Sequence, residues 1–141
     1  MAWSEIMTSA HAALARAEWA LEGGDPGHAA QELRIGTAQA MLAWLKAHHP
    51  NSPLHYGYAS VLRDFAAAAT SGTARALLRL HYRTANLDSV AQGVHHGLAS
   101  GWDGRTSAPI SEDEVGVALE ASHGAVRALE EQLKGEEPCG D

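Results

Sequence analysis

The segment RALLRLHYR, residues 75–83, places an arginine six positions before a histidine. An imidazole can take the proton from a ribose 2′-hydroxyl or return one to the leaving oxygen. A guanidinium can stabilise the negative charge that develops on the phosphate. Arg75 and His81 are therefore candidate catalytic residues for RNA cleavage, a reaction that would need no metal ion here.

The geometry of a single helix argues against this pairing. At about 100° per residue, six positions turn two side chains roughly 120° apart. His81 falls on an apolar face, which predicts a half-buried core histidine. That face consists of Ala74, Leu77, Leu78 and Ala85. An Arg75–His81 dyad would then require a helix break or a second copy of the chain.

Three arginines recur every four residues on the opposite, polar face: Arg75, Arg79 and Arg83. They predict either a solvated stripe or, if the dyad acts across a dimer, a surface that positions an RNA backbone. Trp102, in the loop SGWDGRT, either pins that loop onto the fold or lines a ligand pocket or interface. Trp19 and Trp44 are predicted core or dimer-seam residues.

The nine histidines raise the question of a metal site. Two groups lie at helix ends, where an imidazolium interacts well with the helix dipole. They are His48, His49 and His55 at one break, and His95 and His96 at another. No two histidines have the i, i+4 spacing that brings two ligands together on one helix face.

Glu120-Ala-Ser-His123 has the Glu-x-x-His spacing that di-iron bundles use twice, together with two further glutamates. Its only match is Asp25-Pro-Gly-His28, whose aspartate already serves as a helix cap. We therefore predict no metal ion and no other cofactor. His123 is expected near a helix seam, hydrogen-bonded or facing solvent.

Composition restricts the class of protein. A chain of 141 residues, 45% of them hydrophobic, suffices for one domain with a core. Its net charge of -7 argues against a general nucleic-acid binder, which needs basic surface. The single cysteine, Cys139, excludes an internal disulfide and fits a reducing cytoplasm. Without a signal-peptide pattern or a membrane-length apolar run, we expect a cytoplasmic protein without a membrane contact.

Apolar residues at helical spacing predict an all-α, up-and-down bundle of about five helices. The helices are expected at about 4–21, from 26 to a break at 48–53, from 53 to a break at 70–73, at about 74–95, and from 111 onward. Asp25–Pro26 and Ser52–Pro53 are start signals, as is the capping-box pair Ser111 and Glu114. Residues 1–134 form one domain in this interpretation, and residues 135–141 a disordered tail.

Four of the helices carry apolar stripes that are expected to face inward. The stripe of the first helix is Ile6, Ala10, Ala13, Leu14, Ala17 and Leu21. The second helix has Ala30, Leu33, Thr37, Ala40, Met41 and Trp44, and a further stripe of Ile35, Ala38, Leu42 and Leu45. The third has Leu54, Tyr58, Val61, Leu62 and Phe65, and the last has Val115, Leu119, Ser122, Val126, Leu129 and Leu133. Because the second helix is apolar on two sides, it should be central.

Over residues 8–134 this order of helices and breaks resembles the HEPN domain, the higher-eukaryote and prokaryote nucleotide-binding family. The resemblance rests on DPGHAAQELRIGTAQAMLAWLKAHHP and on SEDEVGVALEASHGAVRALEEQL. It implies a homodimer packed along helices. Many members are ribonuclease toxins, paired with a small nucleotidyltransferase or another antitoxin, and use an arginine with a histidine four to six residues later. Others lack that motif and act as binding or scaffold modules.

Three functions remain open. The first is a HEPN-like homodimeric module that binds or interacts without catalysis. The second is a metal-independent, toxin-type ribonuclease with Arg75 and His81 acting across the dimer, and Arg79, Arg83 and Trp102 binding RNA or another ligand. The third is a small-ligand or metal-binding bundle that uses the histidine-rich helix ends. A histidine packed in the core would favour the first.

Overall fold

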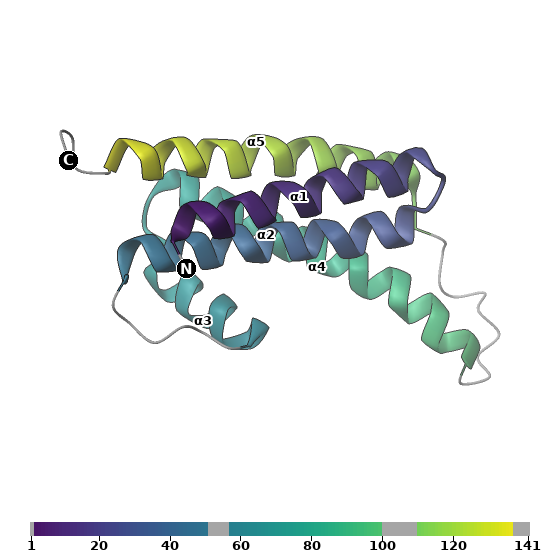
Figure 1. The fold of residues 1–141 in the computed structure, drawn as a ribbon. Coiled ribbons are helices and arrows are strands. Elements are labelled where there is room, and N and C mark those ends of the chain that lie inside the picture. Colours follow the sequence, from purple (N-terminus) through teal and green to yellow (C-terminus); the bar gives the residue numbers. More distant parts are fainter. Residues whose placement is uncertain (1, 51–56, 100–109, 137–141) are drawn as a thin grey trace.

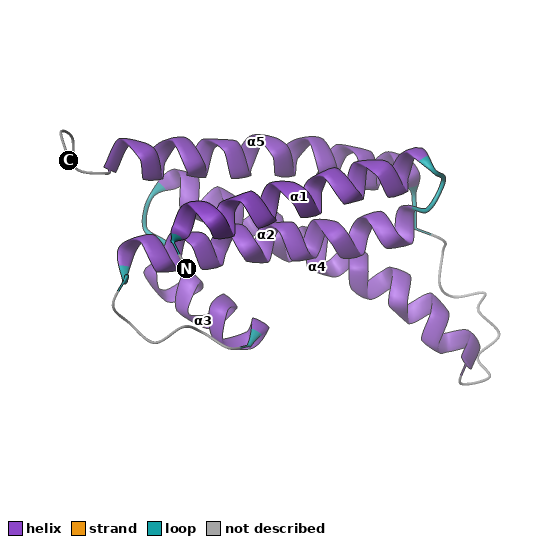
Figure 2. Cartoon of the chain, viewed as in Figure 1, coloured by secondary structure: helices purple, strands orange, loops and turns teal. Residues whose placement is uncertain are grey.

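The computed structural model describes residues 2–50, 57–99 and 110–136, and over these ranges the chain forms five helices and no strand (Figures 1 and 2). In chain order they are α1 (Trp3–Glu22), α2 (Pro26–His48), α3 (Tyr58–Ala68), α4 (Gly72–Ala99) and α5 (Glu112–Glu136). The prediction of an all-α helical bundle is confirmed.

The four long helices run in alternating directions, and the C-terminal part of α4 diverges from the other three (Figure 1). α2 packs against each of the other four helices, so the helix with two apolar sides is central, as predicted. The short α3 contacts only α2 and α4 within the described ranges. Among the described elements, α2 and α4 therefore set its position against the bundle.

The turn between α1 and α2 follows from its sequence. Gly24 has a φ of 80°, a conformation that glycine adopts without steric cost. It lets the amides of Gly24 and Asp25 return to the carbonyls of Leu21 and Ala20, which closes α1. The Asp25 side chain then accepts a hydrogen bond from the His28 amide at 3.1 Å and caps α2, with Pro26 at its first position.

Two more helix starts are capped by serine. The Ser71 hydroxyl accepts from the Ala74 amide at the start of α4, and the Ser111 hydroxyl accepts from the Glu114 amide at the start of α5. The predicted start at Ser52–Pro53 lies outside the described residues. Within them, α3 begins at Tyr58. α5 runs two residues into the segment expected as a tail, and residues 137–141 lie outside the described ranges.

The core consists mainly of the predicted stripes. All six stripe residues of α5 are buried, as are the six of the main α2 stripe, including Trp44 at 6% exposure. Two aromatic residues are exposed and do not belong to the core; for Trp19 the predicted alternative, a dimer seam, stays a prediction. Trp19 is 80% exposed, because it lies outside the stripe that α1 turns inward, and Tyr58 is 39% exposed, because its ring lies at the edge of the bundle.

Small residues allow α1 and α2 to approach closely. Gly36 faces α1, and a Cβ atom built there would lie 2.8 Å from Leu14 Cδ2 and 3.3 Å from the Ala10 carbonyl oxygen. The Leu14 side chain is fully buried and the carbonyl belongs to a helix backbone, so neither has room to move. Glycine at position 36 therefore sets the distance between these helices.

Replacing Gly36 with alanine should lower the free energy of unfolding by about 1–2 kcal/mol. Overpacking of a core costs about 1–3 kcal/mol, and the higher helix propensity of alanine returns at most about 1 kcal/mol. Gly124→Ala is the matched control, because a Cβ atom at that position meets nothing within 4 Å. Urea unfolding should show the control equal to or more stable than wild type. Equal stabilities of the two variants would contradict the close approach.

Candidate functional site

The most unusual buried group in the bundle is the His81 imidazole on α4. It is fully buried, with no exposed surface, between α2 and α3. Its Nδ1 atom lies 2.7 Å from the Thr37 hydroxyl of α2, and its Nε2 atom lies 2.5 Å from the Tyr58 hydroxyl of α3. Both ring nitrogens therefore have partners inside the chain, and the three residues join three helices.

The neighbours of Thr37 indicate where the proton of His81 lies. The Thr37 hydroxyl is 3.0 Å from the Leu33 carbonyl oxygen and 3.2 Å from that of Arg34, and carbonyls can only accept. If Thr37 donates to these carbonyls, His81 Nδ1–H donates to Thr37, and Tyr58 O–H donates to Nε2. In this assignment, the polar hydrogens of Thr37, His81 and Tyr58 each have an acceptor within the protein.

The surroundings hold His81 and Tyr58 in their neutral forms. Burial, together with a smaller effect of the positive charge of Arg34, lowers the pKa of His81 to about 4. Burial also raises the pKa of Tyr58, although the nearby Arg34 opposes that shift. A neutral imidazole and a neutral phenol thus share one hydrogen bond.

Arg34 borders this pair and is held in place by α4. Its Nε atom donates to Asp88 at 2.6 Å, and the guanidinium lies 5.3 Å from the centre of the Tyr58 ring. Asp88 is 4% exposed and also accepts from the Gln92 amide at 3.2 and 3.3 Å. A buried carboxylate with these partners fixes the guanidinium beside the tyrosine.

A shallow groove of about 290 Å³ begins at Tyr58 and Arg34 and runs between α2 and α3. Its polar end consists of Arg34, Gln39 and Tyr58. The remaining wall is apolar, formed by Ile35, Ala38, Leu42 and Val61 together with Gly57. The site therefore combines a fixed guanidinium and a phenol with a short apolar surface, which suits binding of a small amphipathic group.

The structure does not bring Arg75 and His81 together within one chain. α4 is continuous from Gly72 to Ala99, so the helical angle between the two positions is kept. Arg75 is exposed, as are Arg79 and Arg83 along the outer face of α4. Arg75 makes no side-chain hydrogen bond with the described residues. Trp102 lies outside the described residues.

The sequence analysis missed the two hydrogen-bond partners of His81, Thr37 and Tyr58, and the Arg34–Asp88 pair beside them. One signal on α4 could have indicated part of this set. His81, Thr84 and Asp88 are spaced by three and four, so three polar side chains share the buried face of that helix. Buried polar groups need partners, and these had to come from neighbouring helices.

Most of the other described histidines are paired with single carboxylates. The Nε2 atoms of His11 and His48 lie 3.0 Å from Glu130 and Glu136, and that of His123 lies 3.7 Å from Glu18. His48 also donates through Nδ1 to the Trp44 carbonyl. Within the described ranges, no three histidine, cysteine or acidic side chains converge on one point, and His55 with the side chains of His95 and His96 lies outside them.

Comparison with family models, with curated proteins and with solved structures finds no match to this chain. None of the helices in the described ranges has both the length and the apolar character needed to cross a bilayer. The arguments for function therefore come from the site itself.

The buried His81 should make stability depend on pH. Because its folded pKa of about 4 lies below the usual 6.5, the unfolded chain takes up a proton between these values and the folded chain does not. The free energy of unfolding should fall by about 2 kcal/mol from pH 7 to pH 5 through this group alone. Urea unfolding at both pH values measures the change.

In the variant His81→Gln, the fall in the free energy of unfolding from pH 7 to pH 5 should be smaller than in wild type by about 2 kcal/mol, because the contribution of His81 is removed. His49→Gln, which removes an exposed imidazole, is the control and should keep the wild-type difference. If His81→Gln does not fold, the NMR titration of the wild-type His81 ring decides the question. A ring that titrates between pH 7 and pH 6 would contradict the buried neutral form.

Proposed function

We propose that the protein is a HEPN-like homodimeric module that binds or interacts without catalysis. The observation that carries the proposal is the full burial of His81, with both ring nitrogens bonded inside the chain. On the resemblance to the family, the module works in the cytoplasm beside an antitoxin or a small nucleotidyltransferase.

Burial of His81 supports binding over catalysis on chemical grounds. A general acid or base must reach the proton that it transfers, and the Nε2 atom is occupied by Tyr58. An efficient catalytic group also has a pKa near the working pH, whereas the pKa of His81 is lowered to about 4. The imidazole is suited to organising Tyr58 and Arg34, and these two residues border the groove.

The proposed dimer seam is the second apolar stripe of α2. Ile35, Ala38 and Leu42 are half-buried and line the groove beside α3, whereas Leu45 of the same stripe is buried. An apolar face on the central helix is the natural surface for a second copy to cover. A seam here would also place the groove of each copy at the interface.

Ala38→Glu should weaken the dimer at least about tenfold, because it places a carboxylate in an apolar seam opposite its own copy. Ala121→Glu is the matched control, since that alanine is exposed on α5. Sedimentation at micromolar concentration should give a dimer for wild type and control, and a monomer for Ala38→Glu. A wild-type monomer, or a dimer unaffected by Ala38→Glu, would overturn the proposed seam.

A specific observation also favours RNA as a ligand, with cleavage as the second candidate function. Arg75, Arg79 and Arg83 are all exposed on α4, and Tyr82 beside them is 52% exposed. Arginines that contact phosphates together with an aromatic ring that stacks on bases are typical of single-strand binding. In that case, Arg75 would have to act with His81 of the second copy.

We expect the purified protein in EDTA to leave single-stranded RNA intact. Arg75→Ala should behave in the same way, and because Arg75 is exposed this variant should remain folded. Gel analysis of labelled RNA is the measurement, with circular dichroism as the check on folding. Cleavage by wild type that is lost in Arg75→Ala and in His81→Gln would overturn the non-catalytic proposal and establish the nuclease.

A further inference from the structure

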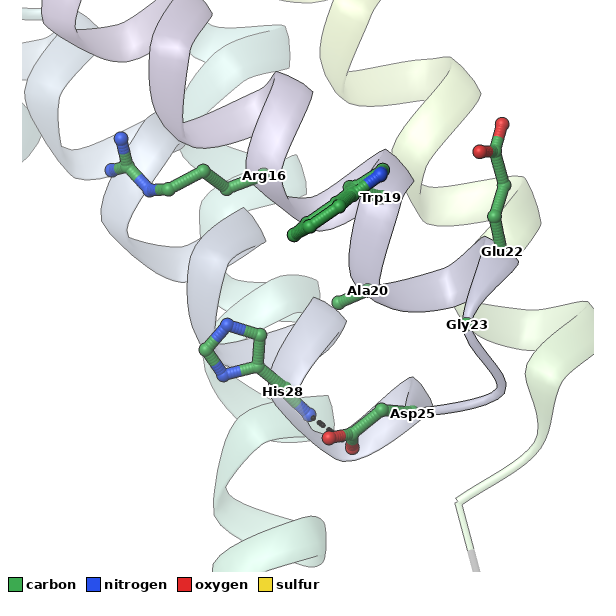
Figure 3. A pocket seen from close by; sticks show the side chains of 7 residues that line it. All are labelled: Arg16, Trp19, Ala20, Glu22, Gly23, Asp25 and His28. Atoms are coloured by element: carbon green, nitrogen blue, oxygen red, sulfur yellow. Dashed lines mark hydrogen bonds between the residues drawn. The ribbon is translucent and has the colours of Figure 1, made fainter.

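The end of α1 and the start of α2 form a hollow of about 710 Å³ that is separate from the groove at Tyr58 (Figure 3). It is lined by Arg16, Trp19, Ala20, Glu22, Gly23, Asp25 and His28. These residues are ordered by the closed end of α1 and the capped start of α2. The hollow is therefore a defined surface and not a loose loop.

Trp19 is the dominant side chain of this hollow. Its indole is 80% exposed, the largest exposure among the large hydrophobic side chains of the described residues. Figure 3 shows the ring on the side of the hollow that Arg16 and His28 border, while Glu22 points away from them. A large flat aromatic face that its own chain leaves uncovered is a typical anchor point for a ligand or partner.

The one arginine of the hollow is already neutralised. Arg16 Nε donates to Glu32 Oε2 at 3.0 Å, and His28 Nε2 lies 3.8 Å from the other oxygen of that carboxylate. Glu32 is 8% exposed and does not line the hollow, whereas the Arg16 side chain lines it and is 54% exposed. An incoming anion would therefore find a guanidinium whose charge is already matched.

The remaining charges near the hollow are negative. Between positions 16 and 32 the chain carries one arginine and four carboxylates. The last turn of α1, the negative end of its dipole, contains no basic residue. Asp25 uses Oδ1 to accept from the His28 amide, and no donor of the described residues reaches its Oδ2 atom. An open acceptor and an open indole thus line the same hollow.

We propose that this hollow binds an arginine side chain carried by a basic segment of a partner protein. A planar guanidinium stacks on an indole face and donates in parallel to a carboxylate, here Trp19 and Asp25. The excess of carboxylates in this part of the chain favours a basic occupant over an acidic one. The binding would be independent of the groove at Tyr58 and of any dimer.

The test uses a blocked peptide with two arginines among glycines and an otherwise identical peptide with citrulline, which keeps the shape without the charge. Each is titrated into the ¹⁵N-labelled full chain, and the indole N–H signals are followed. The signal of Trp19 is assigned from its absence in Trp19→Phe. We expect it to shift saturably with the arginine peptide alone, while the signal of the buried Trp44 stays fixed.

Variants then locate the binding. Trp19→Ala should weaken peptide binding, measured by calorimetry, by about fivefold. Asp25→Asn keeps a capping side chain but loses the charge, and should weaken binding by about threefold. Glu131→Gln, an exposed carboxylate on α5, changes the net charge equally and should have little effect.

Several results would overturn the proposal. These are equal binding of the citrulline peptide, absence of any Trp19 shift at millimolar peptide, and unchanged affinity in Trp19→Ala. An equal loss in Glu131→Gln and Asp25→Asn would show attraction to net charge only, and would also overturn it. None of these results bears on the dimer or on RNA cleavage, so this proposal and the proposed function can fail separately.

Discussion

The pair of hydrogen bonds to His81 determines how the middle of this protein is arranged. α3 touches only α2 and α4 within the described ranges, and Tyr58 on α3 meets His81 on α4 next to Thr37 on α2. An imidazole buried without these partners would cost about 1–3 kcal/mol for each unsatisfied group. The position of Tyr58, and with it the polar end of the groove, follows from the need to satisfy one buried ring.

The architecture could be predicted because it depends on periodicity, and periodicity is visible in the sequence. The stripes of α2 and α5 and the inward direction of His81 follow from the helical repeat. The partners of His81 could not be predicted, because Thr37 and Tyr58 lie on other helices, and spacing along one helix says nothing about contacts across helices. Trp19 lies outside the core because its phase on α1 differs from that of the buried stripe.

The abundance of histidines has a structural explanation in this bundle. Three histidine–glutamate pairs lie between α5 and its neighbours: His11 with Glu130 and Glu18 with His123 join it to α1, and His48 with Glu136 joins it to α2. A metal site would require several such groups at one point, whereas here they are distributed along the length of α5. The same side chains that suggest ligands in the sequence therefore act as separate contacts between helices.

The short turn of Gly23 to Asp25 also has a consequence for the entropy of the chain. Closing a loop costs conformational entropy that grows with the number of residues enclosed. The hairpin of α1 and α2 closes over three residues, whereas the bonds of His81 to Tyr58 and Thr37 enclose separations of 23 and 44 residues. The α1–α2 hairpin can thus form from local encounters alone, while the polar centre requires three helices, α2, α3 and α4, to be in place.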